Sequence, residues 1–269
     1  MAIDPVQIAA HHVQDAAVIV LPFGKEIALP NIFGFQVTKL MAIELLAAVL
    51  MLLIFIPLAR KIRTGKSPRG RWWNAFEAAV LFIRDGVVRP AIGGRDANRF
   101  VPFILTLFFF ILFCNLLGLV PWLGSPTGSI NVTAVLALVA FAVVVGAGMK
   151  KHGPVRFWTG LCPPMDVPKS MAVFLIPMIL SIEILGLVIR HTILAVRLLA
   201  NMFAGHLVVG VIVAFIPVVV HSVLWYGVTP AAVLGATALN LLELFVAFLQ
   251  AYVFAFLTAL FIGMSLHQH

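Results

Sequence analysis

The residues best suited to chemistry are one arginine and a few polar groups set in very apolar sequence near the C-terminus. Residues 198–269 contain no Lys or Arg and a single carboxylate, Glu243, and they directly follow Arg197. A charged side chain at bilayer depth costs about 2.5–3.5 kcal/mol even on lenient insertion scales, so ionisable groups kept there usually serve ion movement. The pattern therefore predicts a protein that moves ions.

The composition places these groups in a membrane protein. Hydrophobic residues make up 62% of the 269, charged residues 10%, and the mean hydropathy is +1.12. Long apolar runs, rather than alternating segments of about ten residues, exclude an outer-membrane barrel. We therefore predict an all-α polytopic membrane protein whose solvent is the lipid bilayer. The net charge of +8 lies mostly in short loops, where the positive-inside rule explains it, so we predict no nucleic-acid partner.

The first predicted transmembrane helix is 40–59, which is long enough to cross the hydrocarbon core. Residues 1–39 lack the pattern of a cleaved signal and are predicted to form an external N-terminal segment, followed by a single membrane domain over 40–269. The loop 60–71 carries six basic residues and no acid. Such loops stay in the cytoplasm, which places the N-terminus outside.

Three further segments follow this loop. Residues 72–90 mix apolar positions at helical spacing with charges, which predicts an amphipathic helix in the membrane plane. Residues 101–120 and 130–149 are uncharged or nearly so and predict a transmembrane hairpin that returns to basic residues. Cys114 and Cys162 lie far apart in sequence without metal or redox spacing, so we predict free thiols.

The stretch 171–220 allows two interpretations. It could hold two upright spans, 171–189 and 198–220, joined by the basic loop RHTILAVR, which would place the C-terminus outside. It could instead be one long helix, about 75 Å at 1.5 Å per residue, which must tilt steeply across a core about 30 Å thick. A second long tilted helix is predicted at 231–266.

Side-chain spacing favours the long helices. Glu183, Arg190 and Arg197 are seven residues apart, so an unbroken helix aligns them on one face, with Asn201 one turn beyond. His206 falls near the opposite face. The last apolar run carries its own polar stripe at offsets of three and seven: Asn240, Glu243 and Gln250.

At these residues the chain resembles subunit a of the F-type proton-translocating ATP synthase. AVRLLANMFAGHL resembles the family's segment around its essential arginine, here Arg197, and NLLGLVP at 115–121 resembles the turn after its third helix. LNLLELFVAFLQAYVF resembles its final helix, with Gln250 at the family's glutamine. His206 and Glu243 form a pair that other members carry in the opposite arrangement, so the pair is kept. The resemblance runs over nearly the whole chain from residue 30 onward.

The resemblance implies a stator subunit of a rotary proton channel. Its fold would be a peripheral transmembrane helix, an in-plane helix, a hairpin and two long tilted helices packed against a ring of c subunits. Its partners would be the c-ring, the b-type subunits of the peripheral stalk and the remaining ATP synthase subunits. The chain has no GxxxxGK[ST] motif, so ATP chemistry is expected on those partners, and we predict no cofactor and no metal. The expected location is a bacterial inner membrane, or alternatively the mitochondrial one, with the C-terminus in the cytoplasm.

Roles for the polar residues follow from this resemblance and from their chemistry. The Arg197 guanidinium stays charged and cannot relay a proton, so it would stabilise an ionised c-ring carboxylate and separate two aqueous half-channels. His206 and Glu243 would exchange protons on the outer access path, and Glu183 on the cytoplasmic exit side. His206 also favours protons over sodium. Further candidates are amides that orient water and two secondary residues: Asn201, Asn240, Gln250, Arg190 and His221.

Each role has a plainer alternative. Arg197 could be a snorkelling or topology residue, and His206 could form an interhelical hydrogen bond. Glu243 could form a structural salt bridge to Arg190 or to a neighbouring subunit, and Glu183 could be the packing partner of Arg190. At the level of the whole protein, the alternatives are a secondary transporter and a structural scaffold. The chain lacks the internal repeat typical of transporters, and a scaffold leaves Arg197 and Glu243 unexplained.

Overall fold

Helices dominate the described part of the chain. The computed structural model describes residues 18–20, 26–28, 31–32, 35–63, 70–120, 123–160, 169–220 and 222–267. Five of its helices are long and apolar enough to cross a membrane. The protein is therefore an all-α polytopic membrane protein, because a helix satisfies its backbone hydrogen bonds internally where no water is present.

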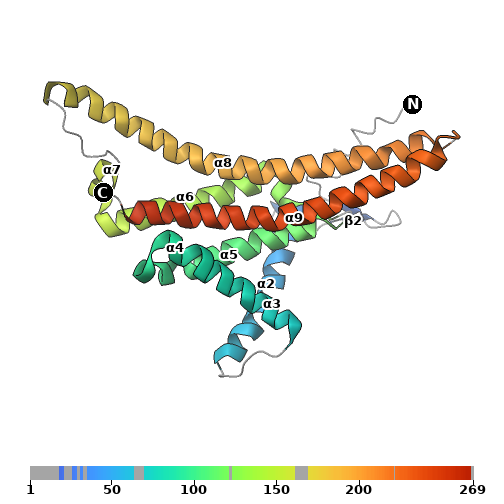
Figure 1. Cartoon of the computed structure of the whole chain (residues 1–269), viewed down its shortest axis with the longest axis horizontal. Helices are drawn as coiled ribbons and strands as arrows, with labels where there is room; N and C mark the ends of the chain where they lie inside the picture. Colours follow the sequence, from blue (N-terminus) through green and yellow to red (C-terminus); the bar gives the residue numbers. More distant parts are fainter. Residues whose placement is uncertain are drawn as a thin grey trace. The chain divides into compact units, whose positions relative to one another are not determined.

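The element order follows the apolar runs of the sequence (Figure 1). Ahead of the helices stand four short strands: β1 (Val18–Val20), β2 (Glu26–Ala28), β3 (Asn31–Ile32) and β4 (Phe35–Gln36). The helices are α2 (Lys39–Arg63), α3 (Arg71–Leu81), the π-helix η1 (Phe82–Val88), α4 (Arg89–Ile92), α5 (Gly94–Gly118), the 3-10 turn η2 (Pro126–Gly128), α6 (Ile130–His152), α7 (Pro154–Gly160), α8 (Lys169–Val218) and α9 (Trp225–Leu266).

The longest helix, α8, runs without interruption for 50 residues. The segment RHTILAVR, residues 190–197, is helical throughout and is not a loop, so the interpretation as two spans joined by a basic loop is wrong. The sequence before and after this segment is rich in leucine, isoleucine, alanine and valine, which favour a continuous helix in an apolar solvent. α9 adds a second helix of 42 residues.

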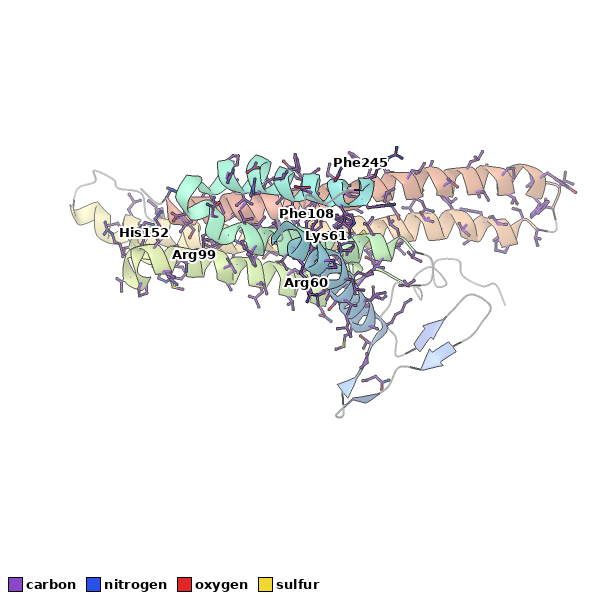
Figure 2. All side chains as sticks on the ribbon, turned by 90° about the horizontal axis from the view of Figure 1, so that it is seen from below. Arg60, Lys61, Arg99, Phe108, His152 and Phe245 are labelled. Carbon is purple, nitrogen blue, oxygen red and sulfur yellow. The ribbon has the colours of Figure 1, made fainter. Side chains whose placement is uncertain are left out.

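Two features fall outside the sequence predictions. The N-terminal strands form two antiparallel hairpins, pairing Val18 with Ala28 and Asn31 with Gln36, and Figure 2 shows them near the start of α2. In addition, the amphipathic helix expected at 72–90 changes from α to π geometry at Phe82. Strands of two or three residues and a π-helix of seven residues are too short to produce a recognisable hydrophobic periodicity, so the sequence did not predict them.

Asp85 of the π-helix forms ion pairs with Arg84 of the same helix and with Arg89 at the start of α4. Asp85 accepts from Arg84 at 2.9 Å and from Arg89 at 2.6 Å. The hydrogen bond from Arg84, together with the positive charges of Arg84 and Arg89, lowers the pKa of Asp85 below its usual value. These side chains are exposed, as expected for the polar face of an amphipathic helix.

The chain divides into two compact units. The first unit comprises Met1–Pro68, Phe109–Thr133 and Arg197–Tyr252. Within it, α2 contacts α5 through Phe55 and Phe109, whose rings lie 4.5 Å apart, and it also packs against η2. Arg60 and Lys61 occupy the last turns of α2 (Figure 2). The first unit thus combines three membrane-length helical segments with the hairpins.

The second unit comprises Arg69–Phe108, Ala134–Val196 and Val253–His269. Its core includes Val145, Phe157 and Leu187, so the short helix α7 packs against α6 and α8. Glycines bring its helices close: a Cβ at Gly263 would meet the Ala91 carbonyl oxygen. Small residues at helix contacts are the usual way for apolar helices to pack in lipid.

Candidate functional site

The candidate site lies on facing parts of α8 and α9 in the first unit. A turn closed by backbone hydrogen bonds from Ser222 to Val219 and from Trp225 to Ser222 joins the two helices. They lie side by side beyond this turn (Figure 1). Five of the predicted site residues therefore come from two antiparallel segments of one unit: Arg197, Asn201 and His206 on α8, and Glu243 and Gln250 on α9.

One hydrogen bond ties the two stripes together. Asn201 Nδ2 donates to Gln250 Oε1 over 2.9 Å. Gln250 is 1% exposed and Asn201 is partly buried, so the bond is at least partly shielded from the surface. Because amides bond at membrane depth without carrying charge, the pair can fix the spacing of α8 and α9 beside Arg197.

A glycine makes room for the carboxyl group of Glu243. A Cβ at Gly205 would meet Glu243 Oε1 and would lie 2.9 Å from Glu243 Cδ and 3.1 Å from Cγ. The Glu243 side chain therefore lies directly on the α8 backbone, at the residue before His206. No larger residue at 205 leaves the carboxyl group in this position.

The site holds several buried polar atoms that lack hydrogen-bond partners within the described residues. They are Arg197 Nε and Nη2, His206 Nε2, Glu243 Oε1 and Gln250 Nε2. A buried polar atom without a partner costs about 1–3 kcal/mol, and more for a charged group. The donors of Arg197 and Gln250 suit an anionic or acceptor group.

Small exposed residues lie beside Arg197. Ala200 and Ala204, at offsets of three and seven, fall on the same helix face and are both exposed. Phe203, Leu242 and Phe245 add exposed apolar surface on α8 and α9, and Figure 2 shows Phe245 at the outer edge of α9. Small side chains let another helix approach closely. This face can accept a second helix within reach of the guanidinium.

The other predicted site residues are placed differently. Glu183 and Arg190 belong to the second unit and face one another at 3.5 Å, each somewhat more than one third exposed. This contact matches the plainer alternative for the two residues, an ion pair along one helix. Asn240 is exposed on α9. His221 lies outside the described residues, as does Cys162, whereas Cys114 is a buried free thiol.

Sequence reasoning missed two contributors in the first unit. Gly205 stood inside the arginine segment without a role, although a glycine next to a polar residue in an apolar helix can mark a close approach. Asn115 opened the segment NLLGLVP, also without a role, yet its side chain is fully buried and donates to the Ala247 carbonyl of α9. A lone amide in an apolar helix was the available signal for it.

A metal has no evident place in the described part of the chain. No group of three or more His, Cys, Asp or Glu side chains there could hold a metal ion. The chemistry that the described groups can perform is charge stabilisation by Arg197 and proton exchange at His206 and Glu243.

Comparison with known proteins gives consistent matches over most of the chain. The family model described as ATP synthase A chain matches residues 41–263. A protein named ATP synthase subunit a from Myxococcus xanthus is 40% identical over 237 residues, which cover 87% of this chain and 75% of that protein. A protein of the same name from Chloroherpeton thalassium is 39% identical over 268 residues, 96% of this chain and 76% of that protein. A third, from Chlorobium phaeobacteroides, is 38% identical over 264 residues, 95% and 73%.

Proposed function

This chain belongs to the ATP synthase subunit a family, and we propose that its Arg197 separates two aqueous half-channels and faces the carboxylates of a rotating c-ring. The family forms the proton-translocating stator part of the membrane sector. The chain is therefore a multi-pass membrane protein that works with the rest of the ATP synthase complex. It is not itself catalytic, because ATP chemistry belongs to other subunits.

The observation that carries the proposal is the incomplete hydrogen bonding of the guanidinium. Arg197 Nε and Nη2 are buried without partners in the described part of the chain. The neighbouring face carries the small, exposed side chains of Ala200 and Ala204. An ionised carboxylate in lipid is strongly disfavoured, but a fixed cation with a planar fork of donors stabilises it. A ring carboxylate that reaches Arg197 would both gain a partner and complete the site.

Proton transfer then occurs on either side of the arginine. A protonated ring carboxyl releases its proton to water in one half-channel, and the resulting carboxylate moves to Arg197. It next takes a proton from the other half-channel and returns to lipid as a neutral acid. Arg197 holds its own proton throughout, so no proton crosses directly between the half-channels. Proton flow is thereby coupled to rotation and to ATP synthesis on the partner subunits.

The remaining polar residues take supporting roles in this proposal. Glu243 and His206 exchange protons on the outer access path. Their buried atoms Glu243 Oε1 and His206 Nε2 have no hydrogen-bond partner among the described residues and can therefore bond to water in that path. Glu183 lies on the exit side, where its contact with Arg190 would hold it until a proton arrives. The orienting or secondary residues are Asn201, Asn240, Gln250, Arg190 and His221.

The proposal extends to partners and location. The exposed apolar face around Phe203 and Phe245 is the surface that we assign to the c-ring, and b-type subunits of the peripheral stalk are the further membrane partners. The basic loop at 60–71 supports a cytoplasmic position for that loop, hence an external N-terminus and a cytoplasmic C-terminus. The bacterial relatives support a bacterial inner membrane.

ATP-driven proton pumping in inverted membrane vesicles tests the proposal. Arg197→Ala should abolish pumping while the complex remains assembled, as judged by purification of all subunits together. Arg84→Ala is the control, because Arg84 is also an arginine but is exposed on η1, has Asp85 as its partner and takes no part in the proposed proton path. Normal pumping by an assembled Arg197→Ala complex would overturn the assignment of the half-channel barrier.

A further inference from the structure

A chain of buried polar groups in the first unit reaches the backbone of α9. It consists of Ser125, Thr127, Asn115 and the carbonyl of Ala247, which we call the Asn115 clamp. Ser125 is 3% exposed, and Thr127 and Asn115 are fully buried. Buried polar groups need their partners, so each member of the clamp fixes the next.

The donors of the clamp run in one direction. Thr127 Oγ1 donates to Asn115 Oδ1 over 2.7 Å, and Asn115 Nδ2 donates to the Ala247 carbonyl over 3.3 Å. A hydroxyl has one proton, so Thr127 must accept at its own oxygen from Ser125, 2.9 Å away. The segment before α6 is thereby linked through α5 to the backbone of α9.

Close packing holds this segment against α5. A Cβ at Gly118 would come 2.5 Å from Ser125 Cβ and 2.6 Å from its hydroxyl oxygen. The 3-10 turn η2, which contains Thr127, also packs against α2. The clamp therefore starts from a part of the unit that is packed on two sides, and such a base can resist movement of α9.

The carbonyl that receives the clamp lies at the level of the candidate site. Ala247 is four residues after Glu243 and three before Gln250, so all three share one face of α9. A hydrogen bond to this carbonyl fixes both the rotation of α9 and its height along the helix axis. These two variables decide whether Glu243 meets Gly205 and whether Gln250 meets Asn201.

We infer that the Asn115 clamp positions Glu243 and Gln250 against α8, and that Asn115 and Thr127 are positioning residues for proton transfer. The inference rests on the proposed function of the α8 and α9 site. Neither residue exchanges the transported proton in this role, since the clamp ends on a backbone carbonyl rather than on Glu243. Loss of the clamp would let α9 rotate while the reacting groups remain present.

Thr127→Val tests the inference, because it keeps the shape of the side chain and removes the hydroxyl. In inverted vesicles carrying the assembled complex, ATP-driven pumping should fall about three- to tenfold, because the substitution removes two buried hydrogen bonds, the one to Asn115 and the one from Ser125. The pH of half-maximal pumping should also shift, because Glu243 would leave its place against Gly205. Thr127→Ser, which retains the hydroxyl, should restore both the rate and the pH profile.

Thr133→Val is the matched control. Thr133 is equally buried in the same unit, but its hydroxyl bonds to the Ser129 and Ile130 carbonyls at the start of its own helix. It should leave the pH profile unchanged. A Thr127→Val complex whose pumping rate and pH profile match those of Thr133→Val would overturn the inference.

Two further variants keep the test decisive. If Thr127→Val prevents assembly, Ser125→Ala removes only the first link and should give a smaller effect in the same direction, whereas a wild-type pH profile in Ser125→Ala would then count against the clamp. Arg197→Ala, measured in the same vesicles, separates the two proposals. Retained pumping in Arg197→Ala refutes the proposed function, whereas an unchanged Thr127→Val beside an inactive Arg197→Ala refutes the clamp alone.

Discussion

The polar groups of the α8 and α9 site differ in their hydrogen bonding from most buried polar groups of the second unit. In the second unit, Ser265 donates to the Val144 carbonyl over 2.8 Å, and Thr258 donates to the Phe254 carbonyl over the same distance. His152 Nε2 lies 3.0 Å from the Leu266 carbonyl oxygen. In the first unit, Arg197, His206, Glu243 and Gln250 each retain a buried atom without a partner among the described residues.

This difference separates polar groups that build the fold from those that await a partner. A closed hydrogen bond in lipid stabilises packing and needs nothing more. An open donor or acceptor is tolerated where water or another protein completes it. One buried atom of the second unit departs from this pattern, His191 Nε2, although its ring packs against Phe141 and Phe261 at centroid distances of 5.2 Å.

The largest effect is expected when Arg197, whose buried donors lack partners among the described residues, is replaced by another cation. Arg197→Lys should reduce pumping by about a hundredfold or more, because an ammonium lacks the planar fork and can lose its proton when desolvated. Arg190→Lys should have a much smaller effect, since the Arg190 side chain is 39% exposed and its contact with Glu183 is long, at 3.5 Å. Equal losses from the two substitutions, measured as ATP-driven acidification of inverted vesicles, would erase the distinction between open and closed groups.

A steric change should give the next largest effect. Gly205→Ala places a methyl group on the Glu243 carboxyl and should lower pumping by about tenfold, in line with the cost of about 1–3 kcal/mol for overpacking. Gly235→Ala is the matched control on α9, because nothing lies within 4 Å of an added Cβ there. That control should pump normally and gain slightly in stability. If Gly205→Ala also pumps normally, Glu243 has room elsewhere and its place against α8 is not required.

A closed group should affect stability and not transport. Ser265→Ala removes the bond to the Val144 carbonyl and should cost about 1 kcal/mol of stability with unchanged pumping. Ser181→Ala, whose hydroxyl is exposed and bonds to the Pro177 carbonyl of its own helix, should change neither quantity. Thermal denaturation of the purified complex measures the first quantity and vesicle acidification the second. A transport defect in stable Ser265→Ala would place a working group in the second unit.

The sequence predicted the helices and the faces of α8 and α9, but not what those faces meet. The apolar runs predicted the helices. The spacing of seven residues between Glu183, Arg190 and Arg197 favoured an unbroken helix across residues 190–197, and the structure confirms it. Periodicity identifies a face and carries no information about the segment that packs on it. The contact of Gly205 with Glu243 therefore could not be read, nor could the bond from Asn115 to Ala247, 132 residues away.

The smallest expected effect concerns the exposed ion pairs of the π-helix. The hydrogen bond from Arg84 and the charges of Arg84 and Arg89 lower the pKa of Asp85 below its usual 3.8. A lowered pKa means that the folded protein binds the proton less tightly than the unfolded chain, so the stabilisation is complete above about pH 3.8 and is lost as the pH falls through the lower folded value. Asp85→Asn removes this pH-dependent stabilisation. The difference in thermal stability between wild type and Asp85→Asn should therefore be constant near neutral pH and should shrink on acidification below about pH 3.8. A difference that does not change with pH would show that Asp85 acts through packing, and these pairs would then no longer belong with the closed ionic groups of the second unit.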